Sequence, residues 1–136
     1  MDIEALLRKP AHRKGLVLAA EGAVIDARGQ LPKKTQLNRL VSICGEATCA
    51  EEITSYLLYQ SSRERWPSSF AKIVIAKLEV PLQELLGPLS GAQEDERDRL
   101  RVATWRLYAV FLVRASTYAT EARNGKKGND HDHPGR

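Results

Sequence analysis

Apolar residues recur every three or four positions along most of the chain, which is the spacing of one helix face. The clearest stripe lies in residues 12–28, where Leu16, Val24 and several alanines are separated by polar side chains. Gly29 follows directly, as is typical just past a helix end. No segment alternates apolar and polar residues long enough to predict a strand. The pattern therefore predicts an all-α fold, a single compact bundle of about five helices.

A short central helix is expected after a loop at residues 30–34 that contains Pro32. Thr35 is a favourable N-cap residue, so we expect it to begin this helix. Gly45 is expected to end it. The apolar side of the helix would consist of Leu37, Leu40, Val41 and Cys44.

Two more helices are predicted between this helix and residue 86. Thr48 and Glu51 have the spacing of a capping box, which starts a helix at Cys49. This helix should stop before Pro67, because the residue preceding a proline avoids helical dihedrals. Ser68 or Ser69 is expected to cap the next helix, and Pro81 within it predicts a kink or a restart.

The last helix is predicted to be long, covering residues 93–123. It is expected to end at Asn124-Gly125, so residues 1–124 would form the bundle domain and residues 125–136 a disordered, flexible polar tail. A second set of apolar residues lies off the main stripe and is available to a partner: Trp105, Tyr108, Leu112 and Ala115. The main stripe of this helix consists of Leu100, Ala103, Leu107, Val110, Phe111, Tyr118 and Ala122.

Composition narrows the possible functions. The chain has 136 residues, of which 43% are hydrophobic, enough for one core. Its net charge of +4 permits binding to nucleic acid or to an acidic partner but is too small for a histone-like role. The apolar runs are too short to span a bilayer, so no membrane association is expected. Asp2 and Glu4 follow Met1 and argue against a signal peptide, so a cytoplasmic location is expected.

Candidate chemistry is sparse. Cys44 and Cys49 are interpreted as small core residues, because a zinc site needs four ligands and the histidines lie far away in the sequence. The carboxylates of residues 94–98 complement a helix N-terminus and favour a structural role. Residues 130–133, Asp-His-Asp-His, lie in the polar tail and predict no preorganised metal site. No nucleophile motif or phosphate loop occurs, so we expect neither catalysis nor a cofactor.

One cluster favours binding of a polyanion. Lys33 and Lys34 precede the expected helix cap, and Gln36 and Arg39 lie on the first turns that follow. A helix N-terminus presents free N–H groups, and adjacent cations make it suitable for phosphate. Cations spread along a path suit a sugar–phosphate backbone. The predicted RNA-binding residues are therefore Lys33, Lys34, Gln36, Arg39, Arg63 and Arg65.

Two other interpretations stay open. A helix-turn-helix motif over residues 36–63 would bind DNA, but Glu51 and Glu52 at the start of its second helix would repel phosphates. A protein–protein interaction module would use the exposed apolar residues of the last helix. For any single cation, an ordinary solvated charge is the simpler interpretation.

A resemblance to a known family adds a more specific hypothesis. The small helical subunit of type III CRISPR–Cas effector complexes resembles this chain in helix order over residues 15–122 and in one motif, Lys34-Thr35-Gln36-Leu37-Asn38-Arg39-Leu40. The resemblance implies a non-catalytic subunit of an antiviral ribonucleoprotein. It also implies that several copies stack beside other effector subunits and support the backbone of the duplex formed by crRNA and target RNA.

Overall fold

The computed structural model describes residues 2–132, with side chains described for residues 2–125. In this part of the chain the fold is entirely helical, which confirms the predicted fold class. None of these helices is both long enough and apolar enough to cross a lipid bilayer. The helices are α1 (Ile3–Leu7), α2 (Pro10–Asp26), α3 (Lys34–Glu46), α4 (Ala50–Ser62), α5 (Ser68–Leu86), the 3-10 turn η1 (Gly87–Leu89) and α6 (Glu94–Asp132).

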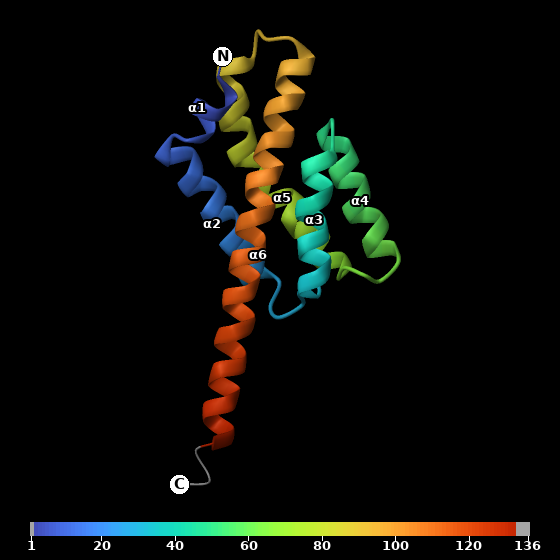
Figure 1. Cartoon of the computed structure of the whole chain (residues 1–136), viewed down its shortest axis with the longest axis vertical. Helices are drawn as coiled ribbons and strands as arrows, with labels where there is room; N and C mark the ends of the chain where they lie inside the picture. Colours follow the sequence, from blue (N-terminus) through green and yellow to red (C-terminus); the bar gives the residue numbers. More distant parts are fainter. Residues whose placement is uncertain (1, 133–136) are drawn as a thin grey trace.

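Helix α6 is the central element of the bundle. Helices α2, α3 and α5 pack against it, and α4 packs mainly against α5 with smaller contacts to α3 and α6. Figure 1 shows α6 running the whole length of the body and then projecting beyond it, away from the end where the N-terminus lies. The loops α2–α3 and α4–α5 lie at the end of the body from which α6 projects (Figure 1).

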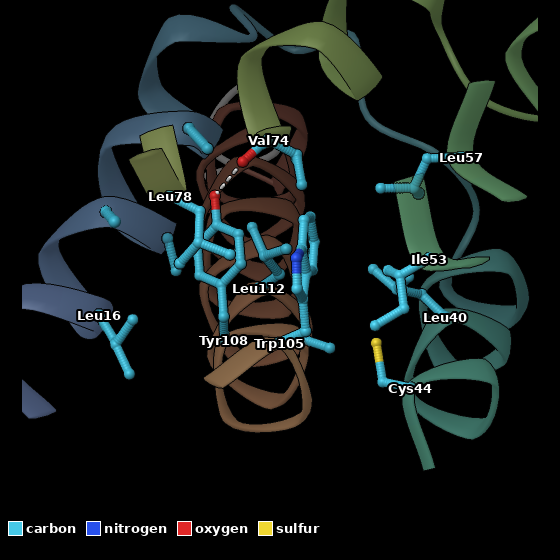
Figure 2. Close-up of a cluster of buried hydrophobic side chains, with 14 of the residues drawn as sticks. Leu16, Leu40, Cys44, Ile53, Leu57, Val74, Leu78, Trp105, Tyr108 and Leu112 are labelled. Carbon is cyan, nitrogen blue, oxygen red and sulfur yellow. Dashed lines mark hydrogen bonds between the residues drawn. The ribbon is translucent and has the colours of Figure 1, made fainter. Parts of the chain in front are cut away.

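The core gathers around the middle of α6. Trp105, Tyr108 and Leu112 are 2%, 0% and 0% exposed. Figure 2 shows these three side chains between Leu16 of α2 on one side and residues of α3 and α4 on the other. Burying side chains of this size stabilises the fold by about 1.5–3 kcal/mol each. The α3 and α4 residues drawn there are Leu40, Cys44, Ile53 and Leu57.

The predicted orientation of the last helix is therefore wrong. Trp105, Tyr108 and Leu112 were expected to be available to a partner, yet they form the core. Tyr118, which was placed on the main stripe, is 77% exposed. Neighbours surround α6 on several sides, so apolar residues occur around most of its circumference and period alone cannot select the buried face. Two of the four aromatic residues of α6, Trp105 and Tyr108, lie among its most buried positions.

The start of α3 also differs from the prediction. Lys33, and not Thr35, is the N-cap residue, and its carbonyl oxygen accepts bonds from the N–H groups of Gln36 (2.9 Å) and Leu37 (3.1 Å). Thr35 lies exposed in the first helical turn. Lys33 has extended backbone dihedrals, and no side chain caps the N-terminus of α3.

The start of α4 uses a variant of the predicted capping box. Cys49 is the N-cap residue and the helix begins at Ala50, one residue later than expected. Glu52, instead of Glu51, reaches back to Thr48, and its Oε1 accepts bonds from the main-chain N–H (2.9 Å) and the hydroxyl group (2.7 Å). These bonds, the hydroxyl bond first, lower the pKa of Glu52.

Three predicted helix breaks lie inside continuous helices. Gly45 lies within α3, which continues to Glu46, and Pro81 lies inside α5 without restarting it. The backbone of α6 remains helical past Asn124-Gly125 to Asp132, so the predicted helix end at that pair is wrong. Within a helix a glycine costs about 1 kcal/mol and a proline about 3 kcal/mol, and packing of the rest of the helix can offset either cost. The predicted tail thus begins as an extension of α6, and its residues 133–136 lie outside the described part.

Candidate nucleic-acid interface

Two loops from distant parts of the sequence form a groove at one end of the bundle. The α2–α3 loop contributes Lys33, and the α4–α5 loop contributes Arg65 and Trp66. We call this cavity of about 740 Å³ the loop groove. Hydroxyl and amide groups dominate the rest of its lining, which consists of Gln30, Leu31, Pro32, Thr35, Gln36, Ser61, Ser62, Glu64, Pro67 and Ser68.

The loop groove contains three of the six predicted RNA-binding residues. Lys33 and Arg65 are exposed, and Gln36 is only 8% exposed. No carboxylate among residues 2–125 forms an ion pair with either cation. Glu64 also lines the groove, so one carboxylate lies near these cations without being bonded to them. Two positive side chains here are therefore free to bind an anion.

Two buried polar groups of the loop groove have unmet hydrogen bonds. The Oε1 atom of Gln36 and the Nε1 atom of Trp66 are buried and have no partner within the described chain. Trp66 is 1% exposed, and its ring stacks on Phe70 with centroids 5.5 Å apart. An unsatisfied buried donor or acceptor costs about 1–3 kcal/mol. The fold therefore retains one unpaired acceptor and one unpaired donor beside the same groove.

A second groove lies on the other side of the α2–α3 loop. This α6 groove has a volume of about 450 Å³ and is lined by Lys33, Lys34 and, from α6, Arg123 and Ser116. The guanidinium group of Arg123 occupies the space that a Cβ atom would need at Gly29, whose φ is +87°. The Ser116 hydroxyl is buried without a hydrogen-bond partner in the described chain. Lys33 therefore lines both grooves, and Lys34 lines the α6 groove.

The N-terminus of α3 adds positive potential to both grooves. Its first turn carries no acidic residue and no capping side chain, whereas α4 and α6 each begin with several carboxylates. The exposed N–H groups of a helix N-terminus carry about half an elementary positive charge. Placing Lys33 and Lys34 beside this charge is unfavourable without a counter-ion. A phosphate group bound here would relieve the repulsion.

The other predicted binding residues lie outside these grooves. Arg39 is exposed on α3. Burial raises the pKa of Tyr56 on α4, and the positive charge of Arg39 acts in the opposite direction. Arg63 donates from Nη1 to the hydroxyl oxygen of Tyr59 at 2.7 Å and lies over the same ring. Arg63 is therefore engaged within α4, and Arg39 faces the α3–α4 side.

The cations near Pro10 do not extend this surface. Residues 8–14 lie where α1 meets α2, at the opposite end of the body from the α2–α3 loop (Figure 1). Arg13 donates from Nε to the carbonyl oxygen of Leu7 at 3.1 Å. A continuous path of cations from Arg8 to Arg65 is therefore not formed on a single chain.

Sequence reasoning missed Arg123, Ser116 and the serines on either side of the α4–α5 loop, which are Ser61 and Ser62 at the end of α4 and Ser68 at the start of α5. No local pattern could have identified them, because Arg123 is about 90 residues from Lys33 and serines are ordinary residues at helix ends.

The remaining candidate clusters have structural roles. Arg101 holds both Glu94 and Asp98 through Nη1, at 2.7 Å each, so these carboxylates stabilise the start of α6. Both cysteines are free thiols, and burial raises the pKa of Cys44 to about 12. No group of three or more metal-binding side chains occurs in the part of the chain that the structure describes, and the side chains of residues 130–133 lie outside that part.

Comparison of the chain with known protein-family models, with curated proteins and with solved structures finds no match.

Proposed function

We propose that this protein binds the sugar–phosphate backbone of RNA through the N-terminal end of α3. One observation supports the proposal most directly. The N–H groups of the first α3 turn, Lys33, Lys34 and Arg65 all contribute positive charge around the same loop, and none of these side chains has a carboxylate partner within residues 2–125. Phosphate binding at such a helix end is a general property of the peptide dipoles.

The proposed role is non-catalytic and architectural. In the context implied by the type III CRISPR–Cas resemblance, several copies would lie along a ribonucleoprotein and support the crRNA–target RNA duplex. That context rests on the motif at residues 34–40. The RNA-binding proposal rests on the grooves and can be tested without the other subunits.

The experiment measures RNA affinity as a function of salt concentration. A variant with Lys33, Lys34 and Arg65 all replaced by Ala removes three candidate phosphate contacts. Each contact with single-stranded RNA contributes about 0.7 to the slope of log Kobs against log salt concentration, so the slope should fall by about 2. Each substitution alters an exposed side chain and should change the free energy of unfolding by less than about 0.5 kcal/mol.

A matched control removes the same charge at the opposite end of the molecule. Lys9, Lys14 and Arg99 are exposed, and their replacement by Ala also lowers the net charge by three. The control should retain nearly the whole salt slope. If both triple variants lose the same slope, binding is diffuse and the proposal is wrong.

A protein–protein interaction module is a weaker second candidate. Of the four residues on which it depended, Trp105, Tyr108 and Leu112 are buried in the chain's own core, and Ala115 is half-buried.

A further inference from the structure

The loop groove has features that a phosphate site does not need. A phosphate would require only Lys33, Arg65 and the N-terminus of α3. The groove also places an unpaired acceptor, Gln36 Oε1, and an unpaired donor, Trp66 Nε1–H, beside these cations. Its volume of about 740 Å³ lies within the range of about 300–1,000 Å³ that is typical of small-molecule sites.

We propose that the loop groove binds one unstacked nucleobase of the RNA strand whose phosphate contacts Lys33 and Arg65. This inference rests on the proposed function and specifies what the groove adds to it. Every RNA base presents at least one donor and one acceptor along its edges. Both atoms are buried in the free protein, so the two side chains must shift when the base enters. The amide oxygen of Gln36 then accepts from the base, and the indole N–H of Trp66 donates to it.

The local structure supports a base instead of a second phosphate. Gln36 lies in the first turn of α3, and Trp66 follows Arg65 directly, so each base-contacting residue is close in sequence to a cation. A phosphate accepts hydrogen bonds but offers no donor to Gln36 Oε1 when it is fully ionised. Glu64 on the groove wall would also repel a second anion.

A base can enter the groove only after it leaves its stack, so the affinity should depend on whether the RNA is single-stranded or double-stranded. Single-stranded RNA exposes its base edges, whereas a duplex keeps them paired and stacked. The groove should therefore favour single strands over fully stacked duplexes of equal length. In the duplex of the proposed function, the bound base would have to be flipped out of the stack. Because all bases carry the required groups, the preference among bases should be small.

The decisive experiment compares two single strands that carry the same phosphates. One is ordinary RNA and the other is abasic at every position. Wild-type protein should bind the ordinary strand about 3- to 10-fold more tightly, and tryptophan emission should change only with that strand. Equal affinity for both strands would overturn the base-binding inference, because the buried polar atoms would then play no part in binding.

The matching variant is Gln36→Leu, which removes the unpaired acceptor at nearly constant volume. It should lower affinity for ordinary RNA about 3- to 10-fold and leave affinity for the abasic strand unchanged. Its melting temperature should equal or exceed that of the wild type, because the amide oxygen has no partner to lose. Gln36→Met repeats the test if leucine packs poorly. Gln83→Leu, an exposed position on α5, is the control.

The outcomes separate the two proposals. If ordinary and abasic strands bind equally but the triple Lys33, Lys34 and Arg65 variant loses salt slope, backbone binding stands and base binding is wrong. If neither strand binds, the proposed function itself is wrong. A Gln36→Leu variant that weakens both strands equally would also contradict base recognition.

Discussion

The hydroxyl group of Tyr108 on α6 donates a hydrogen bond to the main-chain carbonyl oxygen of Val74 on α5, 2.7 Å away (Figure 2). Both residues are fully buried, and their sequence positions are 34 residues apart. Burial raises the pKa of Tyr108, so the phenol stays protonated and remains a donor. This bond fixes how α5 lies against the central helix.

Replacing Tyr108 with Phe should lower the free energy of unfolding by about 0.5–1.5 kcal/mol. The ring would still fill the core, so the loss reports the hydrogen bond alone. Urea denaturation measures the change. Tyr118→Phe is the control, because Tyr118 is 77% exposed and should change stability by less than about 0.5 kcal/mol. Equal effects at the two positions would contradict a structural role for the Tyr108–Val74 bond.

Arg106 should stabilise the end of α3. Its Nε donates to the carbonyl oxygen of Cys44 at 2.8 Å, and its Nη2 donates to that of Gly45 at 3.1 Å. These carbonyls belong to the last turn, where helical partners are missing and a cation is favourable. Arg106→Ala should cost about 1 kcal/mol, measured by thermal unfolding, since the side chain is exposed.

Arg106→Lys provides the test of geometry, because lysine keeps the charge but cannot donate from two fixed positions. It should recover only part of the lost stability. Full recovery would show that charge alone matters. Arg114→Ala, also exposed on α6, is the matched control.

Glu64 has a φ of +60°, a left-handed conformation at the end of α4. The N–H of Arg65 bonds to the carbonyl oxygen of Gln60 at 2.9 Å, which is the closing bond of a Schellman motif. Glycine adopts this conformation without strain, so Glu64→Gly should raise the free energy of unfolding by about 0.5–1 kcal/mol. Chemical denaturation measures it.

A glutamate-to-glycine substitution at a regular helical position should instead lower the free energy of unfolding. Glu84→Gly lies in the last turn of α5, where glycine should cost up to about 1 kcal/mol. If Glu64→Gly destabilises the protein as much as Glu84→Gly does, residue 64 does not adopt the left-handed conformation.

Cys44 and Cys49 should differ sharply in reactivity. Cys44 is 0% exposed, and burial raises its pKa to about 12, whereas Cys49 is half-buried. A thiol reagent should modify Cys49 in the folded protein and Cys44 only on unfolding, as mass spectrometry would show. Rapid modification of both thiols would contradict the packing of α3 against α6.

The raised pKa of Cys44 also predicts a pH dependence of stability. Its ordinary pKa is 9.0, so between pH 9 and about pH 12 the folded thiol keeps a proton that the unfolded thiol releases. The contribution is fully present below pH 9 and is lost as the pH rises through this window. Cys44→Ala should make stability fall less steeply there than in wild type.

Local sequence patterns were sufficient for the helical content of this protein. The three- and four-residue spacing predicted an all-α fold, and Gly29 with its φ of +87° marks the turn after α2 as expected. These features depend on interactions within a few residues, which a local pattern records. Lys33, Lys34 and Gln36 could be grouped for the same reason, because they share one loop and one helical turn.

Tertiary structure alone decided which face of α6 is buried and which cations share a groove. Trp105 and Tyr108 are core residues because helices pack on several sides of α6, a fact that no periodicity contains. Arg65 meets Lys33 only because two loops, about 30 residues apart, end at the same side of the bundle. Periodicity records how a helix repeats along its own axis, whereas the choice of buried face and the meeting of distant loops depend on which arrangement of all the helices buries the most apolar surface.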